Sequence, residues 1–210
     1  NTVAGGSGGG SGAGGGSALG SGLFVQGNNS VTFAPGASQT QVFANAIADQ
    51  TGSGGTGGNA GTGNINKSGA GTTILSADNT YAGTTTVAAG TLQIGSGGTT
   101  GTLGSGAVVN NATLSFNRSN SLTVANALSG SGAVVQQGSG TLVLTGANSY
   151  SGGTTVSAGT LQGNATSLQG NIVNNAAVVF DQTGSGTYAG VMSGTGSLTK
   201  QNTGTLVLTG

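Results

Sequence analysis

The sequence predicts an all-β protein, folded as a right-handed parallel β-helix (β-solenoid) of roughly nine or ten coils. Three observations predict this class. Glycine supplies 47 of 210 residues, about three times its ordinary share, which disfavours long helices because an interior Gly costs about 1 kcal/mol relative to Ala. The apolar residues stand in short alternating runs rich in Val, Thr, Leu and Ile, which is the pattern of strands. A unit of about 64 residues also recurs, and such repeats stack coil on coil.

The repeat is visible as two nearly identical stretches. "GAGTTILSADNTYAGTTTVAAGTLQ" at 69–93 returns as "GSGTLVLTGANSYSGGTTVSAGTLQ" at 138–162. A second pair, at 106–116 and 170–180, has an offset that is shorter by five residues. The five additional residues of the first pair fall within the Gly/Ser/Thr run at 94–106, which predicts an enlarged surface loop in the first copy.

Composition divides the chain at about residue 62. Residues 63–210 hold the β-helix repeats, and the third copy stops at Gly210, from which we expect a fragment of a longer protein. Residues 1–62 begin with a Gly-rich run at 5–22 whose composition is also that of a flexible linker. We expect this run to form coils continuous with the solenoid, because strand-like residues follow it directly. It lacks the Asp of a calcium-binding Gly/Asp repeat and the Lys-Ser/Thr of a phosphate loop.

Each unit contains several strand-like runs separated by Gly, Asn and Ser, which are residues typical of tight turns. In "TLVL" at 141–144 the two-residue period predicts that Leu142 and Leu144 face a narrow lumen, with Thr141 and Thr145 outward. With about 21 residues to a coil, the unit would be three coils long, and equivalent residues would stack on one another.

Two residue types recur at the predicted turns, and we interpret both as structural. Recurrent asparagines at bends can hydrogen-bond along the axis as a ladder. Recurrent tyrosines are expected to cover a coil edge rather than to bind a sugar. The asparagines are Asn79, Asn110, Asn111, Asn148, Asn174 and Asn175, and the tyrosines are Tyr81 and Tyr150.

Charge is sparse, and this excludes several classes of function. The net charge is zero, and the few charged residues do not cluster as a nucleic-acid or anionic-membrane surface requires. A surface this neutral favours self-association, side by side or end to end. The charged residues are Asp49, Lys67, Asp78, Arg118, Asp181 and Lys200.

The residue inventory predicts no catalytic, cofactor-binding or metal-binding residue. The chain has no His and no Cys, which excludes Ser-His-Asp and Cys-His sites, thiolate metal sites and disulfides. A glycosidase needs two converging carboxylates, whereas Asp49, Asp78 and Asp181 stand far apart in the sequence at unequal intervals. No segment has the ~18 apolar residues of a membrane helix, and the start of the chain lacks a signal-peptide pattern.

The second copy resembles the autotransporter-associated β-strand repeat, also called the passenger-associated transport repeat. Members read approximately G-x-G-T-L-x-L-x-G-x-N-x-Y-x-G-G-T-T-V-x-x-G-T-L. The first copy departs from this pattern at Thr73, Ala77 and Thr84. The matching residues of the second copy are Gly140, Thr141, Leu142, Leu144, Gly146, Asn148, Tyr150, Gly152, Gly153, Thr154, Thr155, Val156, Gly159, Thr160 and Leu161.

Family members also tend to carry a lysine just upstream of this motif. Lys67 and Lys200 stand in that place, and Gln136 replaces the lysine in the second copy. The resemblance covers residues 63–210. It implies a secreted passenger region with a right-handed parallel β-helix, located extracellularly or at the surface of a Gram-negative bacterium. It also implies export through an outer-membrane β-barrel C-terminal to this fragment.

From the residues and the resemblance together we predict a non-enzymatic structural repeat. It would be the passenger stalk of an autotransporter, supporting export, folding, and display or adhesion, with a host-cell or matrix surface as partner. Two alternatives stay open: a self-assembling extracellular filament or biofilm matrix protein, and an ice- or glycan-binding β-solenoid. The threonines of "GTTTV" at 83–87 and "GGTTV" at 152–156 suggest the second alternative, although Thr is also simply a good strand residue.

Overall fold

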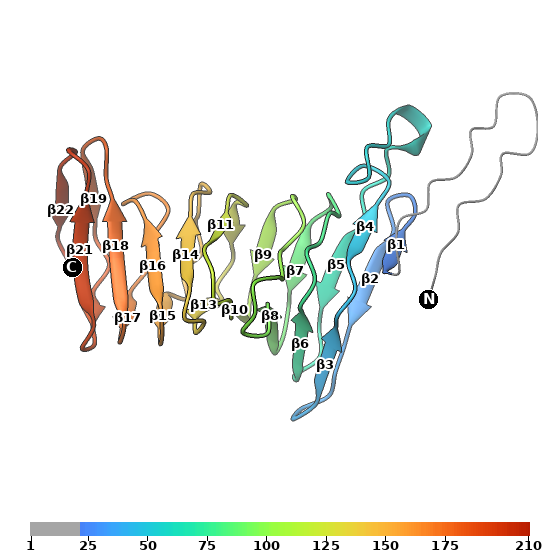
Figure 1. Ribbon diagram of the computed structural model, residues 1–210, viewed down its shortest axis with the longest axis horizontal. Helices are drawn as coiled ribbons and strands as arrows, with labels where there is room; N and C mark the ends of the chain where they lie inside the picture. The colour runs from blue at the N-terminus through green and yellow to red at the C-terminus, as the bar shows by residue number, and fades with distance from the viewer. Residues whose placement is uncertain (1–21) are drawn as a thin grey trace, which may run out of the picture.

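The computed structural model describes residues 22–210, which form a rod of stacked coils (Figure 1). All strand pairs in this part of the chain are parallel. Within it, the short 3-10 turn η1 (Gly57–Asn59) is the one helical element. The predicted all-β parallel solenoid is confirmed, with about nine coils. The predicted coils at 5–22 lie outside the described residues except for Gly22, and the division at residue 62 stays a prediction.

Each coil passes through three faces in a fixed order, I, II and III. Faces I and III each carry a five-stranded sheet, and face II carries an eight-stranded sheet. Two further pairs, β1–β4 and β19–β22, occupy the places of faces III and I in the order along the chain. Four coils have no strand on one of the three faces. The chain still passes the faces in the order I, II and III in these coils.

The strands of face I are β2 (Ser30–Phe33), β5 (Asn64–Lys67), β7 (Thr85–Val87), β9 (Val108–Asn110), β12 (Leu128–Ser129), β19 (Gly186–Tyr188) and β22 (Leu206–Leu208). Those of face II are β3 (Thr40–Phe43), β6 (Thr72–Leu75), β8 (Thr91–Ile94), β10 (Thr113–Phe116), β13 (Ala133–Gln136), β15 (Thr154–Val156), β17 (Ile172–Asn174) and β20 (Met192–Ser193). Those of face III are β1 (Leu23–Val25), β4 (Ile47–Asp49), β11 (Leu122–Val124), β14 (Thr141–Leu144), β16 (Thr160–Gly163), β18 (Ala177–Asp181) and β21 (Ser197–Gln201).

The register of the paired strands gives the length of each coil. From β5 onward the shortest step between paired residues runs from Thr160 to Ala177, and the longest runs from Thr85 to Val108. The step from Ser30 to Asn64 is longer still, because the segment after β4 leaves the wall of the rod before the chain returns in β5. A coil is therefore about 20 residues long, and its corners absorb the variation.

The repeating unit is not a whole number of coils, so the prediction that equivalent residues stack is wrong. Counting three coils along face II from Val134, through the paired residues Thr154 and Ile172, leads to Met192. Leu198 is the equivalent of Val134 in the next copy, and it follows six residues after Met192, on face III. Each unit is thus three coils plus one strand, and each copy is turned by one face relative to the copy before. Unit length can be read from the sequence, whereas coil length depends on the path of the backbone around the lumen.

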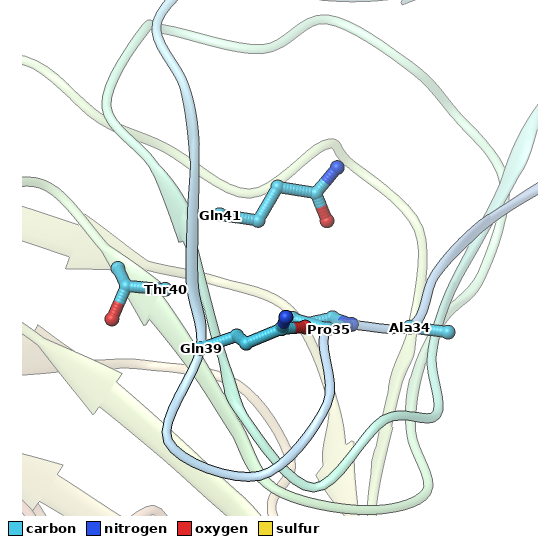
Figure 2. Close-up of a pocket in the computed structure, with 5 residues that line it drawn as sticks. All are labelled: Ala34, Pro35, Gln39, Thr40 and Gln41. Carbon is cyan, nitrogen blue, oxygen red and sulfur yellow. The ribbon is translucent and has the colours of Figure 1, made fainter.

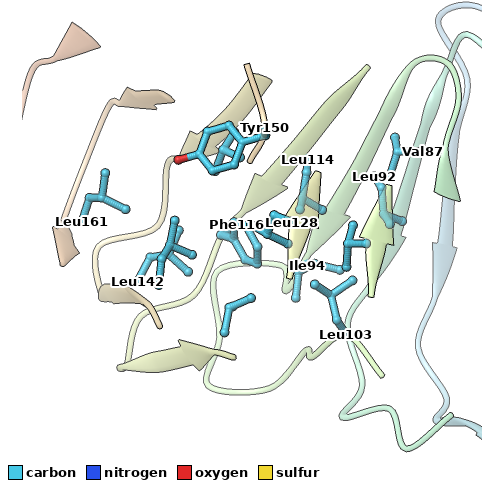
Figure 3. Close-up of a cluster of buried hydrophobic side chains, with 14 of the residues drawn as sticks. Val87, Leu92, Ile94, Leu103, Leu114, Phe116, Leu128, Leu142, Tyr150 and Leu161 are labelled. Atoms are coloured by element: carbon cyan, nitrogen blue, oxygen red, sulfur yellow. The ribbon is translucent and has the colours of Figure 1, made fainter. Parts of the chain in front are cut away.

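Side chains that face inward form one continuous core along the rod (Figure 3). Leu142 and Leu144 are buried and Thr145 is exposed, while Thr141 is half-buried, as their alternation predicts. Near the C-terminal end, the rings of Phe180 and Tyr188 pack edge to face with centroids 5.1 Å apart.

Glycine is required where coils touch at a tight corner. Gly90 and Gly159, which are equivalent in the two copies, have φ of +65° and +62°. A Cβ on Gly90 would lie 2.3 Å from the carbonyl oxygen of Gly71, and one on Gly159 would lie 2.2 Å from that of Gly140. These two positions need both a left-handed backbone and the absence of a side chain.

Candidate functional site

Asp49 at the end of β4 is fully buried, and backbone amides surround its carboxylate. Oδ1 accepts a hydrogen bond from the amide of Gly52 at 2.6 Å. Oδ2 accepts from the amides of Gly63 at 2.7 Å and Ala82 at 2.6 Å. The side chain therefore closes the base of the segment that leaves the rod after β4 and ties it to the next coil.

Asp78 and Arg118 hold the enlarged loop that the first copy carries. The Arg118 Nη1 lies 3.7 Å from Asp78 Oδ1 and donates to the carbonyl of Gly101 at 2.8 Å. The Arg118 Nη2 donates to the carbonyl of Thr99, and Asp78 Oδ1 accepts from the amide of Gly101 at 2.9 Å. Arg118 is 8% exposed. The pair thus fastens the loop to the coils on both sides of it.

Sequence reasoning missed this pairing, although a signal for it exists. The second copy lacks the five inserted residues, and it has Ala147 and Gln182 in place of Asp78 and Arg118. The two opposite charges occur only in the copy that carries the insertion. This co-occurrence indicates that the charged pair holds the inserted loop in place.

The third carboxylate, Asp181, lies at the end of β18. It accepts hydrogen bonds from the side-chain amides of Gln162, at 3.1 Å, and Asn202. Asp49, Asp78 and Asp181 thus belong to separate coils, and each bonds to its own set of neighbours. Across residues 22–210 no group of three His, Cys, Asp or Glu side chains gathers as a metal site would require.

In the first two copies the family's lysine position lies in the lumen, where its side chain satisfies carbonyls at a turn, whereas Lys200 in the third copy is exposed. Lys67 is fully buried and donates to the carbonyls of Gly69 and, at 2.9 Å, Ala89. Burial lowers the pKa of this ammonium group. Gln136 takes the same place in the second copy and donates to two carbonyls, at 2.9 and 3.0 Å. Because an amide serves as well as an ammonium group, the position is structural.

Five of the six asparagines at the bends hydrogen-bond to backbone groups of neighbouring coils, and they do not form the expected ladder with one another. Asn148 accepts from the amide of Leu128 in the coil before, at 2.9 Å, and donates to the carbonyl of Ser167 in the coil after, at 2.8 Å. Asn79 makes the equivalent pair of bonds in the first copy. Each of these side chains bridges three coils.

The ladder prediction is wrong because equivalent positions do not stack. Asn110 lies beside Val87 on face I, and Asn174 lies beside Val156 on face II. Each instead donates to a backbone carbonyl of the next coil at 2.8 Å.

Tyr81 and Tyr150 lie inside the lumen, so the prediction that they cover a coil edge is also wrong. Tyr81 is fully buried. Tyr150 is 2% exposed and lies among the buried leucines labelled in Figure 3. Their hydroxyls hydrogen-bond with the hydroxyls of Thr85, at 2.7 Å, and Thr154, at 2.8 Å. Burial raises the pKa of both phenols. Each ring fills the lumen where its coil has no strand on one face.

The two threonine stretches that suggested an ice-binding surface do not share a row. "GTTTV" forms β7 on face I, whereas "GGTTV" forms β15 on face II. The turn of one face per copy separates them, so they do not make one flat array.

A hollow of about 540 Å³ lies beside β3 at the N-terminal edge of face II (Figure 2). It is shallow, and no ionisable side chain lines it. Its lining residues are Ala34, Pro35, Gln39, Thr40 and Gln41. This set offers amide and hydroxyl hydrogen bonds but no nucleophile or proton donor of ordinary acidity.

Comparison with known proteins identifies the repeat. The passenger-associated transport repeat family matches residues 65–94, 134–162 and 198–210. A relative, "Adhesin BmaC autotransporter" of Brucella suis biovar 1 (strain 1330), is 37% identical over 160 residues. Three stretches of the chain belong to this repeat family, and the chain resembles part of an autotransporter adhesin. The similarity covers 65% of this chain and 5% of that relative, so the chain spans about a twentieth of the relative's length. No solved structure matches the chain.

The three stretches that match the repeat family follow the three faces in turn. The first runs from β5 on face I, the second from β13 on face II, and the third from β21 on face III. The similarity to an autotransporter passenger supports an extracellular or cell-surface location on a Gram-negative bacterium. Within residues 22–210 no helix reaches the length and apolarity that a membrane crossing requires.

Proposed function

We propose that this region is a non-enzymatic stalk of the passenger, which supports export and folding and displays adhesive parts of the protein at the cell surface. The observation that carries the proposal is the unbroken pairing of coil with coil, which runs through all eight strands of face II. Each coil bonds mainly to its two neighbours, as Asn79 and Asn148 do. Such a stack can grow by adding one coil at a time.

The composition supports passage through a pore in an unfolded state. The chain contains no Cys, so no disulfide can form before export and block it. After export, each finished coil presents strand edges on which the next coil can pair. The adhesin named among its relatives agrees with a display role. The charged residues support a structural role as well, since Asp49, Asp78 and Arg118 bond to backbone groups of neighbouring segments.

Two matched deletions in the full-length protein test this proposal. Val134 pairs with Thr154, so deleting residues 134–153 removes one coil and leaves every later strand on its own face. Deleting residues 134–143 removes half of that length and places the following strands on the wrong faces. We expect the first variant to reach the cell surface at nearly the normal level and the second to lose display, measured by antibody labelling of intact cells.

Deleting residues 139–161 provides the third arm, because it removes most of the second family match and exceeds one coil by four residues, which shifts the following strands out of register. We expect reduced surface display together with increased degradation in the periplasm. Normal display of both this variant and the half-coil variant would contradict a role of the stack in export and folding.

A further inference from the structure

Face II is the longest uninterrupted surface of the rod. Its sheet has eight strands, whereas the sheets of faces I and III have five. None of the residues in the eight strands of face II carries a charge. Face II therefore has no charged side chain in its strands that would oppose contact with another uncharged surface.

One row of outward positions runs along the centre of this face through all eight strands. The strand register places these residues side by side from coil to coil. Four of the eight are aliphatic, and the others are Gln, Ser, Thr and Ser; Ser115 is the buried member of the row. The aliphatic residues are Val42, which is 58% exposed, Val173, which is 42% exposed, and the half-buried Ile74 and Val135.

A second row, of threonines, lies beside the first in the N-terminal half of the face. Thr40 pairs with Thr72, Thr72 with Thr91, and Thr91 with Thr113. Together the two rows present methyl groups and hydroxyls at the spacing of strands, about 4.8 Å.

This composition is not a by-product of the repeat. Because each copy is turned by one face, the repeat equivalents of face II residues lie on other faces. The equivalent of Val135 in the first copy is Asn66, on face I. Neighbouring residues in a row of face II are therefore not repeat equivalents of one another.

The charge and shape of face II favour a like surface as its partner. Sheets whose outer faces carry β-branched side chains pack face to face about 10 Å apart. A charged partner would lose hydration here and gain no opposite charge. A second copy of this chain brings no charge to the contact, and the net charge of zero leaves no long-range repulsion between copies.

We infer that face II packs against face II of a second copy of this chain, side by side. Eight strands about 4.8 Å apart and about 10 Å wide bury roughly 400 Å² per copy, or ~800 Å² in total, which is below the ~1,200 Å² of stable interfaces. The contact is therefore weak, with a dissociation constant on the order of 0.1 to 1 mM for this length of rod. This inference is independent of the role of the stack in export.

Single cysteines at repeat-equivalent positions test the inference. The natural chain has none, so Val135→Cys places one thiol near the centre of face II, and Asn66→Cys places one at the equivalent position of face I. In a symmetric contact the centre of each face meets the centre of the other. With a short bis-maleimide we expect several-fold more cross-linked dimer from Val135→Cys. Equal yields from the two variants would overturn the inference.

Sedimentation of the Cys-free chain provides the second arm. We expect the average molecular mass to rise with protein concentration. A double variant, Val42→Lys with Val173→Lys, should abolish this rise. The same changes at Thr32 and Thr86, outward on face I, should leave it intact, provided that all variants keep the circular dichroism spectrum of the parent.

Two outcomes of that experiment would overturn the inference. One is a constant monomer mass up to about 1 mM protein, a concentration at which the expected dissociation constant predicts a substantial share of dimer. The other is an association that persists in the variant with the two face II lysines but is lost in Leu208→Lys, which alters the C-terminal strand β22. That result would indicate end-to-end contact instead.

Discussion

Replacing Asp49 by Asn tests whether one buried carboxylate holds the segment that leaves the rod after β4. In the parent, the two carboxylate oxygens accept three hydrogen bonds, from the amides of Gly52, Gly63 and Ala82. An Asn side chain keeps the shape but has one accepting oxygen. If that oxygen keeps the bond to Gly52, its NH2 group faces the N–H donors of Gly63 and Ala82, and two bonds are lost.

The expected loss follows from the strength of these bonds. Hydrogen bonds to a charged group contribute about 1.5 to 3 kcal/mol each, so losing two costs roughly 3 to 6 kcal/mol. This is a large fraction of the ~5 to 15 kcal/mol that stabilises an ordinary domain. In a stack where each coil contacts its neighbours, the damage should concentrate in the coils around residues 47–82.

Urea unfolding measures the total loss, and hydrogen exchange of individual amides locates it. We expect the amides of Gly52, Gly63 and Ala82 to exchange much faster in the Asp49→Asn variant, while amides in the C-terminal coils change little. Asp181→Asn is the matched control, because that carboxylate bonds only to side chains and is partly exposed; it should cost no more than about 1 kcal/mol. Equal losses from the two variants would refute the role assigned to Asp49.

Three further substitutions test individual contacts. Lys67→Gln should remove one pH-dependent contribution to stability. Burial lowers the pKa of Lys67 from 10.5, so the unfolded chain binds more protons at this group between the two values, and its contribution to stability rises with pH there. The buried tyrosines, whose pKa is raised, act in the opposite direction near pH 10 in both proteins. The test is therefore the difference in unfolding free energy between parent and variant, measured with urea, which should rise in favour of the parent from about pH 7 to about pH 10; an unchanged difference would contradict the assignment. Thr73→Val should stabilise by about 1 to 2 kcal/mol, because the buried Thr73 hydroxyl finds no partner among residues 22–210; an unchanged or lower urea midpoint would count against this. Arg118→Gln should release the enlarged loop, because it removes the hydrogen bonds from Arg118 to the carbonyls of Gly101 and Thr99. The free energy of unfolding should fall by about 2 kcal/mol, and a nonspecific protease should cleave faster at 96–100. Cleavage at the parent's rate would show that Arg118 does not fasten the loop.

Features encoded locally could be predicted from the sequence. Alternation of Leu142 and Leu144 with threonines places the leucines in the lumen because a strand has a period of two residues. The recurrence of Asn148 and Tyr150 marked them as structural, since their repetition follows the turns. Asp49 is used once in the chain, and no spacing rule connects it with Ala82.

The turn of one face per copy could not be predicted, for a physical reason. The offset between copies is a property of the sequence, but the length of a coil depends on how many residues each corner needs to close around the lumen. Three coils of about 21 residues would fill the unit of about 64 residues, whereas the three coils from Val134 to Met192 take 58 residues (192 − 134) and leave one strand over. This small difference per coil decides whether Asn110 and Asn174 share a column, and sequence patterns do not resolve it.

The distance between Thr86 and Thr155 tests the turn of one face per copy most directly. These residues are repeat equivalents at outward positions of β7 and β15, and spin labels can be attached to a double Cys variant because the chain has no other Cys. Two labels on neighbouring faces, three coils apart, should be about 25 to 30 Å from each other by dipolar spectroscopy. If equivalent residues stacked on one face, three coil steps would place them about 15 Å apart. A distance distribution centred near the shorter value would contradict the arrangement described above.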